Sequence, residues 1–375
     1  MNKDNNSTIT THFSVIKDPR VTGRSEHKLI DIIVVAICGA ICGADDWVAI
    51  EAFGKAKQDW FKKFLELPAG IPSHDTFGRV FSLIHTRHFQ ECFLNWVKAA
   101  AQITDGQIIP IDGKTLRRSH DNSVGKAAIH MVSAWSVENH LVLGQVKTEE
   151  KSNEITAIPE LLSLLDVNGC IVTIDAMGCQ KKIAKQIINQ GGDYVFGLKG
   201  NQSSLLKAVE EIFANVGDEE LNSPSFDFFQ TEEKGHGRHE TRSYFTTSFT
   251  DTALSQKWEG LKTAGIVVSE RNVNGKKSED HRYYVSSLKN DAEGFAKAVR
   301  AHWGIENSLH WVLDVAFRED ESRVRKGHGP ENLAVLRHIT LNLIRQEKTA
   351  KLGVKNKRLK AGWDDNYLAR VVFGQ

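Results

Sequence analysis

Apolar residues recur at helical intervals through the first hundred positions of the chain. Polar residues separate them, as expected for helices that bury one face. The strongest stretches are LIDIIVVAICGAICG (29–43), DWVAIEAFGKAKQDWFKKFL (46–65) and HFQECFLNWVKAAAQI (88–103). We therefore predict an all-helical N-terminal domain over residues 1–101.

One short helix of this domain has a sharply marked start. Pro72 interrupts the preceding pattern, and Ser73 is a suitable N-cap for a helix that carries Arg79. The arrangement is consistent with the second half of a helix-turn-helix, which would make this a DNA-binding domain. A helix that only packs against its neighbours is the alternative, and the pattern taken alone favours it.

Short strands alternate with helices from Gln107 onward. The order of the predicted elements is β-β-β-α-β-α-β-α, which indicates a mixed sheet with helices on its faces. Among mixed sheets this order matches the ribonuclease H-like fold. The predicted elements are strands 107–112, 128–136 and 141–148, helix 154–165, strand 170–175, helix 180–190, strand 193–198 and helix 203–216.

Strands return after residue 216, and an Asn-Gly pair at 274–275 predicts a hairpin there. Helical spacing resumes near Ala292, and a basic stretch after residue 347 is expected to be a mobile link to a last amphipathic segment. The fold class is thus α/β, a ribonuclease H-like sheet interrupted by a β-rich insertion and preceded by helices. The predicted divisions are 1–101 (helical domain), 102–216 (catalytic core, first part), 217–290 (β-rich insertion), 291–346 (catalytic core, second part) and 347–375 (basic tail).

Composition limits the classes of function. The 48 basic and 47 acidic residues nearly cancel, so contact with DNA would need local patches rather than a global field. Five cysteines show no metal-binding spacing. The apolar run 32–44 is shorter than the roughly 20 residues that a bilayer span needs, and the first ten residues lack the order of an export signal. We expect a cytoplasmic protein with no membrane partner.

A glutamate stands among apolar residues in RAHWGIENSLHWVLDV (300–315). On a regular α-helix Glu306 shares a face with Trp303, Leu309 and Leu313, so it should be buried. A buried carboxylate costs several kcal/mol unless a cation meets it, which favours a metal or a local partner. The alternative is a ladder of helical ion pairs at four-residue steps, through His302, Glu306, His310, Asp314 and Arg318.

Two predicted strands end on an aspartate. Asp112 follows IIPI and Asp175 follows IVTI, and the carboxyl ends of strands in such sheets are where ligand sites gather. Together with Glu306 they could form a cluster of three acids, which would repel one another unless cations neutralise them. Two Mg²⁺ ions about 4 Å apart would do so and would suit phosphoryl transfer. A strand-end aspartate that only forms a turn is the alternative.

Six motifs occur in order along the chain: GIPSHDTFGRVF, IIPIDGKTLRRS, VTIDAMGCQKKIA, YVFGLKGNQ, HGRHETR and RAHWGIENSLHWVLDVAFRED. This set resembles the H-repeat-associated group of DDE transposases from bacterial insertion sequences. The resemblance runs from about Pro19 to Leu343, nearly the whole chain, and several long motifs in order make it specific.

The resemblance implies that Asp112, Asp175 and Glu306 bind two Mg²⁺ ions, which Mn²⁺ can replace. Metal-activated water would hydrolyse a phosphodiester at the transposon end, and the freed 3′-hydroxyl would attack target DNA. The implied partners are the terminal inverted repeats and the target DNA. A homodimer at least is implied, because two ends must be held together.

The chain departs from related insertion-sequence transposases around the glutamate. His302 stands where Arg is expected, and Leu313 stands where Lys would fall. Arg300, His310 or Arg318 could take their places in holding the terminal phosphate.

Several basic and polar residues are candidates for contacting DNA, with a solvated or structural surface as the alternative reading. Trp303 could be a core residue or a platform for an unpaired base. His302 and His310 could also act as partners of Glu306. The DNA candidates are Lys114, Arg117, Lys199, Asn201, His236, Arg238, Arg242, Arg300, Trp303 and His310.

Two rival functions remain at this point. A zinc hydrolase could use His302, Glu306 and His310, but the chain lacks the H-E-x-x-H motif and this leaves Asp112 and Asp175 without a role. A transposase-derived DNA-binding protein that no longer cuts would bind DNA equally well with Asp112 replaced by Asn.

Overall fold

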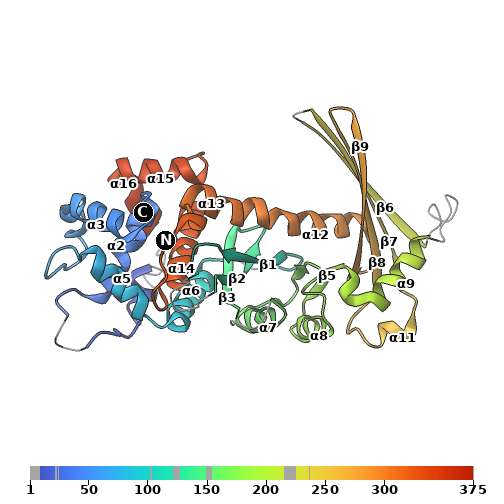
Figure 1. The fold of residues 1–375 in the computed structure, drawn as a ribbon, viewed down its shortest axis with the longest axis horizontal. Helices are drawn as coiled ribbons and strands as arrows, with labels where there is room; N and C mark the ends of the chain where they lie inside the picture. The colour runs from blue at the N-terminus through green and yellow to red at the C-terminus, as the bar shows by residue number, and fades with distance from the viewer. Residues whose placement is uncertain are drawn as a thin grey trace, which may run out of the picture.

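The structure is a computed structural model that describes residues 9–374 except 22, 24, 102–103, 121–126, 149–153, 215–224 and 236. Three parts follow one another along its longest axis (Figure 1): helices from both ends of the chain, a central sheet, and an arm of long strands. Among the described residues, no helix is both long and apolar enough to cross a bilayer.

The N-terminal part is helical, as predicted. Helix α2 is buried almost throughout because its sequence is apolar except for Asp31, whose carboxylate accepts a hydrogen bond from the backbone of Leu67 (2.9 Å). Ser73 caps α5 as expected, since its hydroxyl accepts from the Thr76 amide (3.3 Å). The helices are α1 (Ile9–Phe13), α2 (Leu29–Ile41), α3 (Trp47–Ala56), α4 (Gln58–Phe61), α5 (His74–Leu83) and α6 (Thr86–Ala100).

The central sheet has the strand order β3-β2-β1-β4-β5 on one side. Strands β1, β2 and β3 pair antiparallel, whereas β4 lies parallel to both β1 and β5. This is the ribonuclease H-like arrangement that the order of elements predicted. The strands are β1 (Ile108–Leu116), β2 (Ile129–Ser136), β3 (Leu141–Lys147), β4 (Ile171–Ile174) and β5 (Asp193–Leu198).

Helices cover both faces of this sheet. Figure 1 shows α7 and α8 on one face and the long helix α12 along the other. Helix α12 contacts β1, β4 and β5, so it carries residues from the arm across the sheet to the end of β1. The helices are α7 (Glu154–Leu164), α8 (Lys181–Asn189), the short turn η2 (Gly200–Gln202), α9 (Ser203–Ala214) and α12 (Ala292–Ile305).

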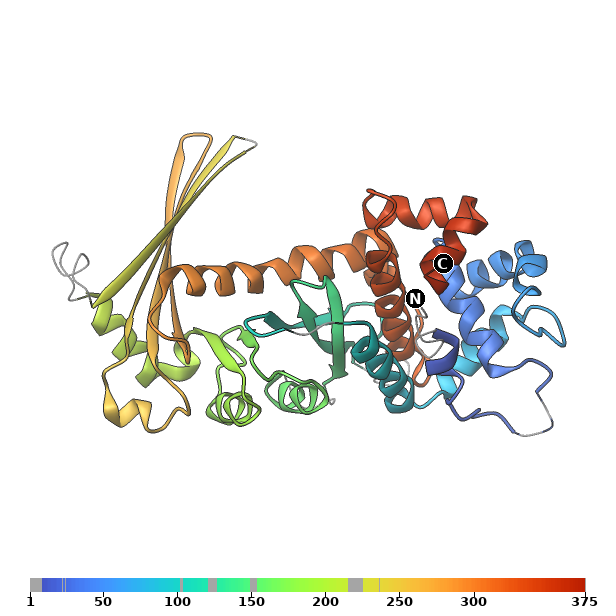
Figure 2. The same cartoon turned by 180° about the vertical axis from the view of Figure 1, so that it is seen from behind.

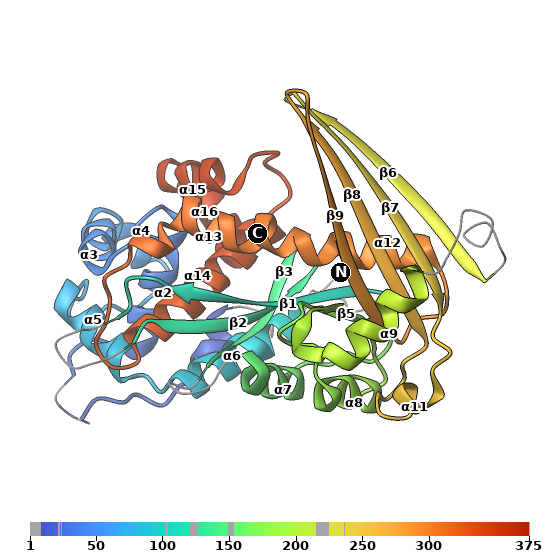
Figure 3. The same cartoon turned by 45° about the vertical axis from the view of Figure 1, so that its right-hand side comes forward.

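The predicted β-rich insertion continues the same sheet instead of forming a sheet of its own. Strand β9 pairs with β5, and the order runs on as β9-β8-β7-β6 to make nine strands. Figure 3 shows these four strands rising as a twisted arm. Asn274 and Gly275 both have positive φ, which confirms the predicted tight hairpin. The elements are β6 (Phe226–Gly235), β7 (Arg238–Ser248), α11 (Thr252–Ser255), β8 (Thr263–Val273) and β9 (Lys276–Ser286).

The C-terminal helices pack back onto the N-terminal ones (Figure 2). Helix α14 lies against α2, and Asn332 donates to the carbonyls of Phe81 and Ile84 (both 2.8 Å). The stretch after residue 347, expected to be a mobile link, instead forms two packed helices. The elements are the π-helical turn η3 (Glu306–His310), α13 (Trp311–Phe317), η4 (Glu319–Glu321), α14 (Gly329–Gln346), α15 (Val354–Trp363) and α16 (Asp365–Phe373).

Candidate active site

Asp112 and Asp175 stand at equivalent positions on neighbouring parallel strands. Ile111 of β1 is paired with Ile174 of β4, and each aspartate is the next residue along its strand. The two acids therefore lie side by side on neighbouring strands. Asp175 follows the last residue of β4, as predicted, whereas β1 continues past Asp112 to Leu116, so the prediction that this strand ends on Asp112 was wrong.

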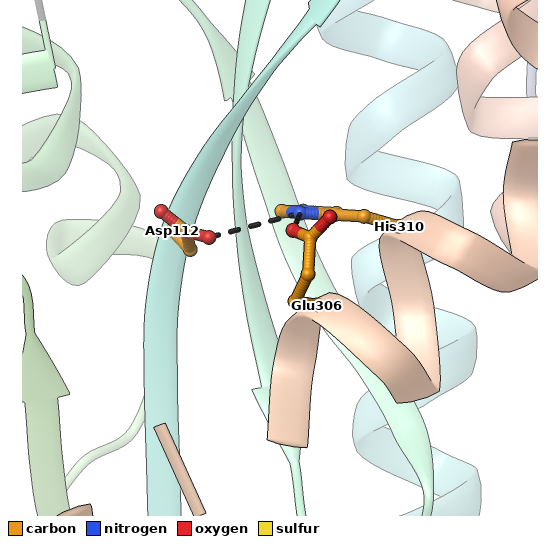
Figure 4. Close-up of side chains that lie close together, drawn as sticks. All are labelled: Asp112, Glu306 and His310. Atoms are coloured by element: carbon orange, nitrogen blue, oxygen red, sulfur yellow. Dashed lines mark hydrogen bonds and ion pairs between the residues drawn. The ribbon is translucent and has the colours of Figure 1, made fainter. Parts of the chain in front are cut away.

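Glu306 and His310 reach Asp112 from a π-helical turn. The α-helical pattern of α12 gives way at Glu306–His310 to a wider turn, in which hydrogen bonds span five residues rather than four. His310 Nδ1 lies 3.0 Å from Glu306 Oε2 and 3.7 Å from Asp112 Oδ2 (Figure 4). Turns of this kind interrupt α-helices most often at functional sites.

The donor atoms of these three residues fit a single cation. One ligand atom from each of Asp112, Glu306 and His310 lies within 4.8 Å of the other two. Two ligands on opposite sides of a Mg²⁺ ion are about 4.2 Å apart, so a small closure would bring all three into contact. Carboxylate oxygens are the preferred ligands of Mg²⁺ and Mn²⁺, whereas an imidazole nitrogen suits Zn²⁺ and other transition metals.

Asp175 is not part of this group. Its Oδ1 accepts hydrogen bonds from the amides of Met177 (2.9 Å) and Gly178 (3.3 Å), which is the turn-forming role weighed against a catalytic one. In this arrangement the carboxylate is directed at its own loop. It would have to rotate away from those amides to share a metal with Asp112.

His302 lies near both aspartates. Its Nδ1 is 3.1 Å from the hydroxyl of Thr173. Burial lowers the pKa of His302, and the negative charges of Asp112 and Asp175 oppose that shift only in part. Burial therefore disfavours the charged form of this imidazole beside the acids.

Burial also shapes the electrostatics of Asp112. Loss of solvent raises the pKa of this carboxyl, and the neighbouring His310, His302 and Gly113 amide counteract the rise only in part. A bound cation would favour the ionised form and remove the cost.

A fourth carboxylate, Glu154 at the start of α7, raises the pKa of Asp112 further and was missed by the sequence reasoning. Its Oε1 lies 2.8 Å from Nε2 of His130, a residue of the neighbouring strand β2. Gly113 leaves room for this pair, since a Cβ there would lie 2.1 Å from Glu154 Oε1. In the sequence, the glycine directly after Asp112 was the feature that could have indicated a close neighbour at this point.

The prediction that Glu306 is buried was wrong. Its side chain is 68% exposed, because it lies on the π-helical turn and not on the continuing apolar face of α12. Trp303 is also 41% exposed, and the Arg282 guanidinium lies 4.0 Å above its ring. The end of the apolar face borders an open cleft that Asp175 and Lys199 also line.

Of the five described residues in the predicted ladder of ion pairs, Glu306 and His310 pair with each other and no other two neighbours in the ladder do. Glu306 and His310 are paired, while Asp314 pairs with Lys114 and Arg318 pairs with Glu321.

Arg300, His310 and Arg318 are the predicted replacements for the basic groups expected around the glutamate. Of these, His310 lies at the acids. Arg300 pairs with Glu233 (2.6 Å) and Arg318 with Glu321, and Leu313 is buried in the core.

Lys114 belongs to an internal cluster rather than to an exposed DNA-facing loop. Its ammonium contacts Asp314 and Glu319 (2.9 Å to the latter), and its side chain is 12% exposed. Glu319 in turn lies 3.5 Å from Arg337, which is also buried. The predicted phosphate contact does not fit this position, because two carboxylates already occupy the ammonium.

Three other residues predicted to contact DNA lie near the site but differ in their exposure and their partners. Arg117 is exposed and pairs with Asp320 (3.1 Å), and Lys199 is exposed at the cleft beside Asp175. Asn201 donates to the carbonyl of Ala176 (2.7 Å), so it braces the loop that carries Asp175.

The arginines of the arm do not form an open basic face. Arg238 and Arg242 both pair with Glu240, which is fully buried, and Arg271 joins them at 2.8 Å. Arg242 also pairs with Glu233 (3.1 Å). Their face of β7 is the one that packs toward α12, which explains the burial. His236 lies outside the described residues.

Comparison with known protein families identifies the family of this chain. A family model described as Transposase DDE domain matches residues 98–343, and one described as DDE_Tnp_1-associated matches residues 10–97. The chain belongs to the DDE transposases. The predicted resemblance is thereby confirmed, and the transposase domain covers the sheet, the arm and the glutamate helix.

Relatives place this transposase in the H-repeat-associated group. It is 46% identical to the "H repeat-associated putative transposase YhhI" of Escherichia coli (strain K12), over 98% of both chains. It is 47% identical to the "Putative transposase YncI" of Escherichia coli O157:H7, over 97% of this chain and 94% of that one. A cryo-EM structure of the piggyBac transposase synaptic complex with hairpin DNA matches at 12% identity and a TM-score of 0.46, over 98% of this chain and 77% of that one.

Proposed function

We propose that this transposase hydrolyses a phosphodiester at each end of an insertion sequence and then joins the freed 3′-hydroxyl to target DNA. The observation that carries the proposal is the meeting of Asp112 and Glu306, far apart along the chain, beside His310. Asp175, on the adjacent strand, is proposed to complete the set of acids after its carboxylate turns from the amides of Met177 and Gly178.

The acids would hold two Mg²⁺ ions, or Mn²⁺ in their place, through carboxylate oxygens. Such ions, when bound, supply activation of water and stabilisation of the oxygens that attack and leave. The chain itself positions the acids: β1 and β4 fix the two aspartates, and the π-helical turn presents Glu306. Burial disfavours the charged form of His302, which lies close to both aspartates, and this favours the binding of cations there.

DNA is the proposed partner, both as transposon ends with inverted repeats and as target. The exposed side chains that surround the acids are proposed to contact it, with Trp303 as a surface on which an unpaired base could stack. Two ends must be brought together, so we propose that at least two copies of the chain act in one complex. The proposed contacts are Arg117, Lys199 and Trp303.

The two rival functions differ in how well they fit the observed site. A zinc hydrolase built on His302, Glu306 and His310 would need all three at one point, whereas His302 is hydrogen-bonded at Thr173 and lies outside the group of three donors. A transposase-derived protein that binds DNA without cutting it is separated from the proposal by measurement of cleavage.

The test is nicking of a duplex that carries the inverted repeats found beside the gene. Mg²⁺-dependent nicking is expected, and Asp112→Ala, Asp175→Ala and Glu306→Ala should each lower its rate by roughly a thousandfold, about 4 kcal/mol of activation free energy. Glu160→Ala, which removes an exposed acid on α7, serves as the matched control and should leave the rate unchanged.

Circular dichroism melting would establish that each variant is folded. Unchanged nicking in any one acid variant would remove that residue from the site. DNA binding without nicking by the unaltered chain, in Mg²⁺ or Mn²⁺, would favour the inactive DNA-binding protein.

A further inference from the structure

A wide cleft separates the N-terminal helices from the segment that follows α13. Its volume is about 1020 Å³. One wall is formed by the starts of α3 and α5, and the other by residues 318–326. This cleft is distinct from the acidic site, since neither Asp112 nor Glu306 lines it.

Most carboxylates in this cleft are already engaged. Asp45 pairs with Arg358 (2.5 Å), and Asp46 caps α3 by accepting from the Ala49 amide (2.8 Å). Glu321 pairs with Arg318. Asp75 remains, 3.7 Å from His74. Asp45 and Glu321 are therefore neutralised by arginines, whereas Asp46 and Asp75 keep their negative charges.

Three cations on opposite walls have no such partners. Arg79 of α5 and Arg323 and Lys326 of the facing segment are exposed, and no side-chain hydrogen bond or ion pair of theirs occurs among the described residues. Unpaired basic groups facing one another across a cleft are the arrangement that a chain of phosphates would neutralise.

The cleft is joined to the catalytic edge by the end of β1. Asp112 and Leu116 are four residues apart on that strand, a distance of about 13 Å, and Arg117 and Arg118 follow directly. Arg325, which lines the cleft, donates to the carbonyl of Arg118 (3.3 Å). Duplex DNA rises about 3.4 Å per base pair, so DNA in the cleft would lie at least about four base pairs from the scissile phosphate.

We propose that this cleft binds the sugar-phosphate backbone of duplex DNA flanking the cleavage point, through Arg79, Arg323 and Lys326. The inference rests on the proposed function for the identity of the polyanion. Helix α5 would then form one wall of the DNA-binding cleft. The other wall, residues 318–326, follows the turn and helix that carry Glu306, so one continuous stretch of the chain would contact both the flanking DNA and the scissile phosphate.

The experiment measures DNA binding as a function of salt in an Asp112→Asn background, so that cleavage does not interfere. The probe is a fluorescein-labelled duplex long enough to span the acidic site and the cleft, followed by fluorescence anisotropy. Replacing Arg79, Arg323 and Lys326 together by Gln should lower the slope of log affinity against log salt by about 2.7, which is up to roughly 500-fold in affinity at 0.1 M salt.

Two matched proteins make the result specific. A triple variant of exposed lysines away from the cleft, Lys63→Gln with Lys98→Gln and Lys257→Gln, should keep the original slope. Arg79→Lys with Arg323→Lys keeps the charge and should retain binding, since lysine also contacts phosphate.

An unchanged slope and affinity in the cleft variant would overturn the inference while leaving the transposase activity proposal intact. If the Asp112→Asn protein bound no duplex even at low salt, the proposed function itself would fail. Equal loss in the cleft and control variants would also overturn the inference, because it would show a non-specific effect of charge.

Discussion

At the scale of single residues, buried charges next to the site are compensated by specific partners. Glu319 is almost completely buried, and burial alone would raise its pKa, yet the charges of Lys114 and Arg337 outweigh burial and hold the pKa below its usual value. Lys114 and Glu319 line a small cavity together with His310, the last residue of the turn that carries Glu306. Lys114, which the sequence suggested as a DNA contact, is thus part of the protein interior.

Replacing Lys114 by Met should reveal this internal role. The change leaves Glu319 buried without its closest cation, so we expect the free energy of unfolding in urea to fall by about 3–5 kcal/mol. Arg117→Gln, which removes an exposed ion pair three residues along, should cost about 1 kcal/mol or less. Equal and small losses from both changes would contradict the assignment of Lys114 to the interior.

At the scale of elements, the π-helical turn decides which side chains meet Asp112. Residues four apart, such as Glu306 and His310, are neighbours on a regular helix too, but such a helix would place Glu306 on the apolar face, whereas on the turn its side chain is exposed beside Asp112. The turn is held from behind, because Arg345 of α14 donates to the carbonyl of Ser308 (2.5 Å). The geometry of the proposed site therefore depends on a local irregularity of the backbone.

Deleting Asn307, an exposed residue within the turn, should convert it to regular α-helix. Helices α12 and α13 would keep their packing, but Glu306 and His310 would no longer be four residues apart. We expect the affinity for Mn²⁺, measured by calorimetry, to fall at least about tenfold, as for loss of a supporting contact in a metal site.

The substitution Asn307→Ala keeps the length of the turn and is the control, with Mn²⁺ affinity close to that of the original chain. If the deletion variant is folded by circular dichroism and binds Mn²⁺ as well as this control does, the turn is not needed for the site.

At the scale of the whole molecule, the two ends of the chain form one folded unit. Arg358 of α15 is buried, and its guanidinium donates to the carbonyl of Ala40 (2.8 and 3.0 Å), contacts Asp45 and lies 4.1 Å above the Phe317 ring. One side chain thus joins the end of α2, the end of α13 and the C-terminal helices. The helical domain and the glutamate helix are held in a fixed relation by such contacts.

Replacing Arg358 by Ala should destabilise the entire molecule. It removes both hydrogen bonds from the guanidinium to the Ala40 carbonyl and leaves Asp45 without its cation, so we expect a loss of about 3 kcal/mol or more in the free energy of unfolding. Lys355→Ala, an exposed change on the same helix, should stay within about 0.5 kcal/mol. A mobile tail, as the basic sequence had indicated, would respond equally weakly to both changes.

Much of the fold was predictable because its signals are local. Periodicity within windows of ten to fifteen residues indicated the helices, the strands β1 to β5 and the Asn274–Gly275 hairpin, and apolar runs ending on Asp112 and Asp175 marked the edge of the sheet. The continuation of the sheet through β5 and β9 could not be read in this way, because strand pairing joins residues almost a hundred positions apart.

By itself, the sequence determined the order of elements, the class of fold and the position of Asp175 at a strand end, since each depends on neighbours along the chain. Tertiary structure alone decided that Glu306 is exposed on a π-helical turn and that Lys114 is held by Asp314 and Glu319. The physical reason is that exposure, ion pairing and the direction of a side chain are set by contacts with segments up to two hundred residues away, and no local pattern records them.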